Sequence, residues 1–186
     1  MKKVFPFIVL IVVTILFITS EVVIKTQSSN AGQLVRSKEK FTLYEKLFQE
    51  LTVKTNTGKR VKLSAIKAPV VILNFWASWC IPCIKEFPSL VELKSKFKDS
   101  ELVVLGFNND EGAQEKIIKK FEKKYKLNFA SVADKASYIT TDKFLISDIP
   151  VSIIYENGKI YEVSKGDRDF NDIDLSKLIK KANSSL

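Results

Sequence analysis

The chain has 186 residues, of which 46% are hydrophobic, and it contains only 6 Gly and 5 Pro, so a compact domain with a folded core is expected. Its formal net charge of +9 arises from 30 Lys and Arg against 21 Asp and Glu. Because these basic residues are scattered among carboxylates, the charge indicates a solvated surface and argues against a nucleic-acid partner.

The N-terminus differs in character from the rest of the chain. Two lysines precede an apolar run over residues 4–19, and no small-x-small cleavage motif follows this run directly. We expect a signal anchor over residues 1–24, with a cleaved signal peptide as the alternative, and a polar tether over residues 25–40. The position of the two lysines places the N-terminus in the cytoplasm and a folded domain, residues 41–186, outside it.

Residues 41–76 predict the first elements of that domain. A short amphipathic segment is followed by two strands around an Asn56-Thr57-Gly58 turn. Residues 70–75 are continuously apolar, which is typical of a central strand buried on both faces. Apolar residues at helical spacing over 84–97 then predict a helix, with Pro82 in the first turn, where proline is tolerated.

Both cysteines of the chain, Cys80 and Cys83, lie at this junction between strand and helix. The chain has no His, which excludes a Cys-His mechanism and, within this chain, a zinc site or c-type haem attachment. A disulfide between them would close only a tiny loop and stabilise little, so a reversible dithiol remains. A helix N-terminus lowers a thiol pKa, so we expect Cys80, nearer the solvent, to attack and Cys83 to resolve the mixed disulfide.

The remaining elements alternate strands and helices. A strand at 101–107 precedes the run NNDEG, residues 108–112, which is too short for an EF-hand and is interpreted as a surface turn. A helix with apolar residues over 117–125 and another strand at 128–134 follow. Ile149-Pro150 then precedes an apolar strand, a strong Asn157-Gly158 hairpin signal and a last helix predicted at 172–182.

The stretch NFWASWCIPC resembles the active-site strand, turn and helix of the thioredoxin superfamily. With Pro88, the Ile149-Pro150 motif and the N-terminal apolar run, residues 50–182 are more specifically similar to the ResA/TlpA/CcmG group of membrane-anchored thiol-disulfide oxidoreductases. The resemblance implies an α/β thioredoxin fold, in which helices flank a central mixed sheet. It also implies an N-terminal β-hairpin and an inserted strand-helix unit.

The resemblance also implies roles for single residues. The Ile149-Pro150 bond is expected to be cis, with the backbone of Ile149 pairing with an extended substrate, and Trp79 is expected to cover Cys80. Asn74 stands where thioredoxins carry a buried Asp and cannot act as a base. We therefore expect Glu86 to take over proton transfer, the alternative being a solvated carboxylate paired with a lysine.

The leading hypothesis is a membrane-anchored, periplasm-facing or cell-surface enzyme that reduces disulfides of exported proteins. The resemblance implies apocytochrome c as a substrate and a membrane thiol-electron donor as the source of electrons. We expect no cofactor and no metal, and the absence of a Thr-x-x-Cys pattern argues against a peroxidase. A dithiol oxidase or isomerase, and a redox-inert peptide-binding module, remain as alternatives.

Overall fold

The computed structural model describes residues 38–184. The predicted membrane segment, 1–24, lies outside the described residues, as does the predicted tether, 25–40, except for its last three positions. The chain divides into two units at Thr42 and Leu43, and the second unit carries all the strands of the described part. Over residues 38–184, no helix has the length and apolar character that crossing a membrane requires.

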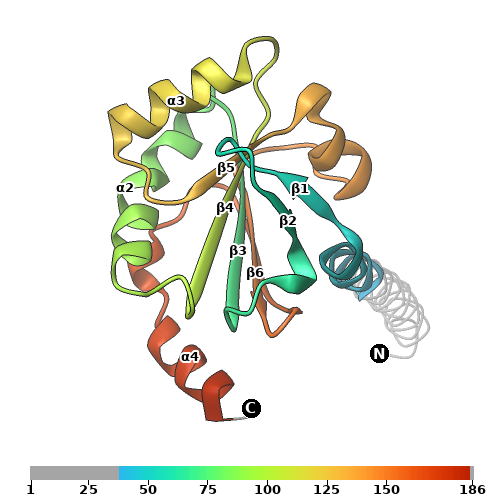
Figure 1. Cartoon of the computed structure of the whole chain (residues 1–186), viewed down its shortest axis with the longest axis vertical. Coiled ribbons are helices and arrows are strands. Elements are labelled where there is room, and N and C mark those ends of the chain that lie inside the picture. Colours follow the sequence, from blue (N-terminus) through green and yellow to red (C-terminus); the bar gives the residue numbers. More distant parts are fainter. Residues whose placement is uncertain (1–37, 185–186) are drawn as a thin grey trace, which may run out of the picture. The chain divides into compact units, whose positions relative to one another are not determined.

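The second unit is built around a mixed five-stranded sheet with the order β5-β4-β3-β6-β7 (Figure 1). Strand β3 pairs in parallel with β4 and antiparallel with β6, and all of its residues are buried, which confirms the predicted central strand. β4 and β5 are parallel, whereas β6 and β7 form an antiparallel hairpin. The strands are β3 (Val70–Trp76), β4 (Leu102–Asn108), β5 (Ala130–Ala133), β6 (Val151–Glu156) and β7 (Lys159–Lys165).

The helices cover the sheet in the order that the apolar spacing predicts. Helix α2 (Ile81–Ser95) begins directly after the cysteine-bearing turn, and α3 (Gln114–Tyr125) connects β4 to β5. The last helix, α4 (Leu175–Ser184), starts later than predicted because a short 3-10 turn, η4 (Phe170–Asp172), comes first. Residues 43–50 are also helical.

Two further structures lie outside the main sheet. The predicted N-terminal hairpin is present as strands β1 (Thr52–Lys54) and β2 (Arg60–Lys62), which form an antiparallel pair, followed by the 3-10 turn η1 (Leu63–Ala65). Between β5 and β6 the chain forms two irregular turns, η2 (Lys135–Ser137) and the π-helical η3 (Tyr138–Lys143), which sequence periodicity does not predict.

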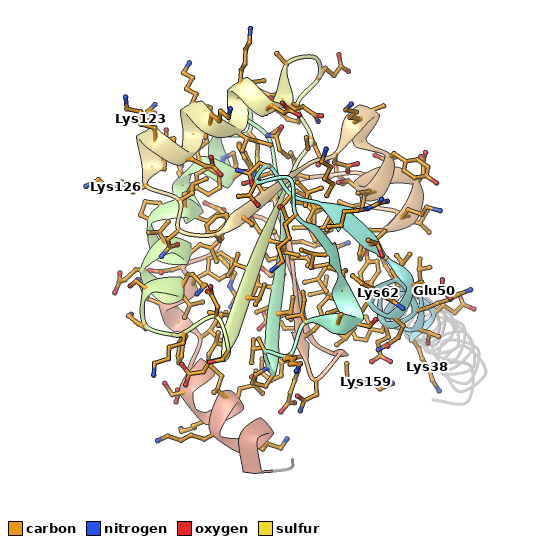
Figure 2. All side chains as sticks on the ribbon, in the orientation of Figure 1. Lys38, Glu50, Lys62, Lys123, Lys126 and Lys159 are labelled. Atoms are coloured by element: carbon orange, nitrogen blue, oxygen red, sulfur yellow. A yellow bond between two sulfur atoms is a disulfide. The ribbon has the colours of Figure 1, made fainter. Side chains whose placement is uncertain are left out.

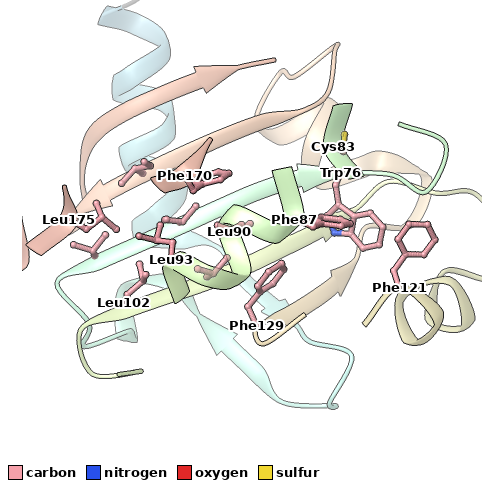
Figure 3. Packing of buried hydrophobic residues seen from close by; sticks show 14 of the residues in the cluster. Trp76, Cys83, Phe87, Leu90, Leu93, Leu102, Phe121, Phe129, Phe170 and Leu175 are labelled. Atoms are coloured by element: carbon pink, nitrogen blue, oxygen red, sulfur yellow. The ribbon is translucent and has the colours of Figure 1, made fainter. Parts of the chain in front are cut away.

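The sheet separates two hydrophobic clusters because side chains alternate along a strand. Val70, Ile72 and Trp76 of β3 belong to the first cluster, and Val71, Leu73 and Phe75 to the second. Figure 3 shows the first cluster, in which Phe87 of α2 packs beside Trp76 and Leu90 lies further along the helix. Asn74 has the same parity as Ile72 and Trp76, so it points toward α2.

Most of the basic residues lie on the outside of these layers, although Lys94 is buried and Arg168 is partly buried. Figure 2 shows the side chains of Lys123 and Lys126 projecting from the α3 end, and Lys62 and Lys159 are exposed elsewhere on the second unit. On α3 the lysines occupy the face opposite Ile118 and Phe121, which are buried. This arrangement agrees with the prediction that the positive charge forms a solvated surface.

Candidate active site

The two cysteines form a disulfide at the start of α2, with their Cα atoms 5.3 Å apart. Cys80 is the N-cap residue of the helix, and its Sγ accepts a hydrogen bond from the backbone N–H of Cys83 at 3.2 Å. The helix starts here because Pro82 fits the first turn, where its missing N–H leaves no intrahelical bond unmade. The predicted placement of a dithiol at a helix N-terminus is therefore found in the structure.

The apolar residues beside the cysteines are more exposed to solvent than the cysteines themselves. Trp79 and Ile81, on either side of Cys80, are each 67% exposed, whereas Cys80 is 4% exposed and Cys83 is fully buried. Cys80 is nearer the solvent than Cys83, as expected, but both cysteines are buried. In the disulfide-bonded state it packs into the first cluster with Trp76, and the flanking side chains present the surface instead.

The second motif lies beside the cysteine turn, as the resemblance implies. The Ile149-Pro150 bond is cis, and Val151 pairs with Phe75, so Pro150 lies level with the end of β3. The Pro150 carbonyl accepts a hydrogen bond from Gly166 N–H at 3.0 Å, which ties the proline to the chain that follows β7. Ile149 is partly buried and packs against both clusters.

Asn74 and Glu86 form a buried pair beneath the cysteines. The Nδ2 group of Asn74 donates to Glu86 Oε1 at 2.6 Å and to Ser152 Oγ at 3.0 Å. Glu86 lies one turn after Cys83 on the same side of α2, because residues three apart in a helix are neighbours. Sequence reasoning assigned Asn74 only an inability to act as a base; the structure adds that it is the donor that holds Glu86.

The environment of Glu86 favours its neutral form. The residue is 2% exposed, and this burial raises the pKa of its carboxyl to about 7. The hydrogen bond from Asn74 and the backbone N–H and charge of Arg168 act in the opposite direction but are smaller effects. This burial rules out the alternative of a solvated carboxylate paired with a lysine, and the carboxyl can exchange a proton near neutral pH.

A second buried carboxylate, Asp110, holds the turn that carries the cysteines. Its Oδ2 accepts from Ser78 N–H at 2.8 Å, and its Oδ1 accepts from Ser78 Oγ at 2.7 Å. Asn108 Nδ2 adds a third donor at 2.6 Å. Because Ser78 lies two residues before Cys80, Asp110 fixes the backbone from which the N-cap cysteine projects.

The interpretation of NNDEG as a surface turn is wrong for the first half of this run. Asn108 is fully buried and Asp110 is 5% exposed. Asn109 links two turns: its N–H donates to Trp76 O at 2.8 Å, and its side-chain oxygen accepts from Thr140 Oγ1 at 2.8 Å. The sequence contained a signal for this burial. Residues 108–110 directly follow β4, and residues after neighbouring parallel strands lie at the same edge of the sheet, here beside the turn that follows β3.

The structure gives no candidate metal centre among the residues it describes. Over 38–184 there is no group of three or more Cys, Asp or Glu side chains that is placed to hold a metal ion. The groups gathered at this site are a thiol pair, a buried carboxyl and an exposed apolar rim.

The chain is similar to known proteins over most of the described residues. Residues 45–163 match the model of the AhpC/TSA family. Thiol-disulfide oxidoreductase ResA of Bacillus cereus is 32% identical over 141 residues, which cover 69% of this chain and 80% of the relative. ResA of Bacillus subtilis (strain 168) is 34% identical over 110 residues, covering 59% and 60%.

A solved structure supports the same assignment. StoA from Bacillus subtilis superposes with a TM-score of 0.56 at 27% identity, covering 69% of this chain and 94% of that protein. The shared architecture confirms the predicted thioredoxin fold, in which a mixed sheet lies between helices. The chain belongs to the AhpC/TSA family and is a thiol-disulfide oxidoreductase with a thioredoxin-like fold.

Proposed function

We propose that this oxidoreductase works outside the cytoplasm as a reductant of disulfides in exported proteins. The observation that carries the proposal is the Cys80–Cys83 disulfide at the α2 N-terminus, with the exposed Trp79 and Ile81 beside it. The two cysteines lie close enough to pass reversibly between a dithiol and a disulfide, which thiol-disulfide exchange in either direction requires. The apolar rim provides a surface on which a substrate chain can rest during exchange.

The reaction begins with the reduced pair. The Cys80 thiolate attacks one sulfur of the substrate disulfide, forms a mixed disulfide with it and releases the other substrate sulfur as a thiolate. Cys83 then attacks Cys80 Sγ, which releases the second substrate thiolate and leaves the Cys80–Cys83 disulfide. Two electrons pass to the substrate, whose two thiolates take up protons, and a dithiol donor must reduce the pair again.

Three neighbouring residues support these steps. In the proposed reaction Ile149, before the cis proline, pairs its backbone with an extended substrate segment, and the exposed Trp79 covers the reacting sulfur. Glu86 accepts the proton of Cys83 when that thiol attacks, because its raised pKa lies near neutrality and it follows Cys83 by one turn. In this scheme Glu86→Gln slows exchange by about 10²-fold near pH 7.

The side chains between the cysteines support the reducing direction. A strong oxidant of this superfamily stabilises its reduced form by stabilising the thiolate. Here the side chains of Ile81 and Pro82 supply no donor to the Cys80 thiolate, so its stabilisation comes from the backbone N–H of Cys83 and the helix N-terminus. Without a side-chain donor the thiolate is less stabilised than in such an oxidant, which favours the disulfide and makes the dithiol a better reductant.

The location and the partners are part of the same proposal. The apolar run of residues 4–19 supports an extracytoplasmic domain held at the membrane, periplasmic or at the cell surface. The resemblance to the ResA/TlpA/CcmG group supports apocytochrome c thiols as the substrate and a membrane thiol carrier as the electron donor. Labelling of Cys80 by a membrane-impermeant maleimide in intact, reduced cells is expected, and protection until lysis would contradict this location.

The test of direction is the reduction potential of the Cys80/Cys83 couple, measured on the full-length chain in detergent equilibrated with dithiol buffers. A value below about −230 mV is expected for a reductant. A value above about −180 mV would make the protein an oxidase or isomerase instead. A pair that does not exchange at all would leave a redox-inert peptide-binding module.

The order of attack is tested by single cysteine variants. Cys83→Ser is expected to accumulate a mixed disulfide with a substrate such as insulin, because Cys80 attacks but nothing resolves the product. Cys80→Ser, the matched control, is expected to accumulate none. Equal trapping by the two variants would show that the assignment of attacking and resolving thiols is wrong.

A further inference from the structure

The segment that follows β7 packs against the turn of α2 that carries Glu86. Ser89 Oγ donates to the Glu86 carbonyl at 2.9 Å and accepts from Phe170 N–H at 3.1 Å. Phe170 is fully buried in the first cluster, and Gly166 N–H donates to Pro150 O at 3.0 Å. The segment 166–170 is therefore fixed at one end to the cis proline and at the other to the helix of the buried acid.

Arg168, in the middle of this segment, is a restrained and mostly buried cation. Its side chain is 17% exposed, its Nη1 pairs with Glu162 of β7, and its guanidinium carbon lies 5.3 Å from the centre of the Phe170 ring. Its Nε is buried and has no hydrogen-bond partner within the described residues. An arginine held by a carboxylate and an aromatic ring cannot swing into solvent, so its charge acts at a fixed place.

The groups that act on the Glu86 carboxyl come from three elements. Asn74 of β3 donates a hydrogen bond, and the backbone N–H and positive charge of Arg168 lower the pKa of the carboxyl. The negative charge of Asp167, an exposed neighbour, raises it. Adjacent residues of one segment therefore act on the buried acid with opposite signs.

We propose that Arg168 is a positioning residue of this enzyme, which anchors the Glu86 carboxyl and thereby sets the pH range in which thiol-disulfide exchange is fast. The proposal rests on the proposed role of Glu86 as the proton acceptor of Cys83. Glu162 keeps the guanidinium in place, and the segment 166–170 couples this position to the cis proline. The positive charge of Arg168 thus influences the ionisation of the Glu86 carboxyl, which is shielded from solvent.

The test follows the ionisation of Glu86 in the full-length protein. Glu side chains are labelled with ¹³C, the Glu86 carboxyl resonance is identified by its loss in Glu86→Gln, and its midpoint is read by NMR in oxidised protein. Arg168→Met is expected to raise this midpoint by about one pH unit, because a neighbouring cation favours the carboxylate. Asp167→Asn is expected to lower it, and damage to the fold does not produce two shifts of opposite sign.

Two further variants separate charge from packing. Arg168→Lys keeps the charge and the backbone N–H, so it is expected to retain most of the wild-type midpoint. Arg60→Met makes the same change at an exposed arginine of β2 and is expected to leave the midpoint unchanged. A Glu86 midpoint that stays within about 0.2 units in Arg168→Met, or moves equally in Arg168→Lys, overturns the proposal.

The pH profile of glutathione disulfide reduction by the dithiol form supplies the functional readout. In Arg168→Met the rising limb of this profile is expected to move to higher pH together with the Glu86 midpoint. For a shift of one unit, the exchange rate at a pH below the midpoint should fall about tenfold. If the midpoint moves but Glu86→Gln has the wild-type profile, the proton-transfer role of Glu86 fails, and with it the part of the proposal that concerns exchange. An unmoved midpoint overturns the role of Arg168 whatever Glu86 does.

Discussion

The two buried carboxyl groups near the cysteines, those of Asp110 and Glu86, have different surroundings. Asp110 accepts hydrogen bonds from two side chains and one backbone N–H, all within 2.8 Å. Glu86 accepts from Asn74 and lies beside Arg168, and desolvation dominates its ionisation. A buried carboxylate that is well supplied with donors can hold a turn, whereas a poorly solvated one is suited to gain and lose a proton.

The largest effect is expected from removing the Asp110 carboxyl. Asp110→Ala removes the acceptor of three donors, one of them buried and two partly buried. We expect it to lower the free energy of unfolding by about 4 kcal/mol, because hydrogen bonds to charged groups contribute about 1.5–3 kcal/mol each and do not add fully. Urea unfolding of the oxidised protein measures this. Asp142→Ala, at an exposed aspartate, is the control. A loss below about 1 kcal/mol would show that Asp110 is not what holds the turn.

Glu86→Gln tests the other carboxyl through the pH dependence of stability. Because burial raises the folded pKa from 4.5 to about 7, the wild-type protein is expected to lose stability as the pH rises from about 4.5 to about 7. The loss relative to the Gln variant should reach about 3 kcal/mol, since one pKa unit corresponds to about 1.4 kcal/mol. Urea unfolding of both proteins at pH 4.5, 6 and 8 measures the difference.

The control for this experiment lies two turns further along α2. Glu92 is exposed, and its pKa is lowered by hydrogen bonds from Lys96 and Asn171, the opposite direction from Glu86. Glu92→Gln should therefore not reproduce the loss of stability between pH 4.5 and 7. A wild-type curve parallel to that of Glu86→Gln over this range would contradict the raised pKa.

The smallest effect is expected at Ser78. Ser78→Ala removes one of the two hydrogen bonds that Ser78 makes to Asp110 and keeps the backbone N–H, so a loss of about 1 kcal/mol is expected. The rate of insulin reduction should fall only slightly, because the turn remains held. Ser95→Ala, at an exposed serine of α2, is the control for a serine-to-alanine change that does not affect Asp110. An equal loss of stability in both variants would show that the Ser78 hydroxyl does not help to hold the turn.

Much of the fold and the centre of the site could be predicted from local patterns. The buried strand at 70–76, the helix after the cysteines and the Asn157-Gly158 hairpin each follow from hydrophobic periodicity or turn chemistry. The irregular turns at 135–143 do not, because they contain two residues with positive φ, Ala136 and Ser137, that no periodicity marks. The boundaries of the last helix shifted for a similar reason: a 3-10 turn precedes it.

The sequence by itself determined the chemistry of this protein: two cysteines at a strand-to-helix junction, without His, leave a dithiol as the reactive group. Only the tertiary structure decided which polar residues support it. Asn74 and Glu86 are far enough apart in the chain that their hydrogen bond depends on α2 packing over β3, and Asp110 reaches Ser78 only because β3 and β4 are parallel neighbours. The sequence gives the type of each side chain directly, but its burial and its hydrogen-bond partners depend on contacts between segments that are far apart in the chain. For Glu86 those contacts set the affinity of the carboxyl for a proton.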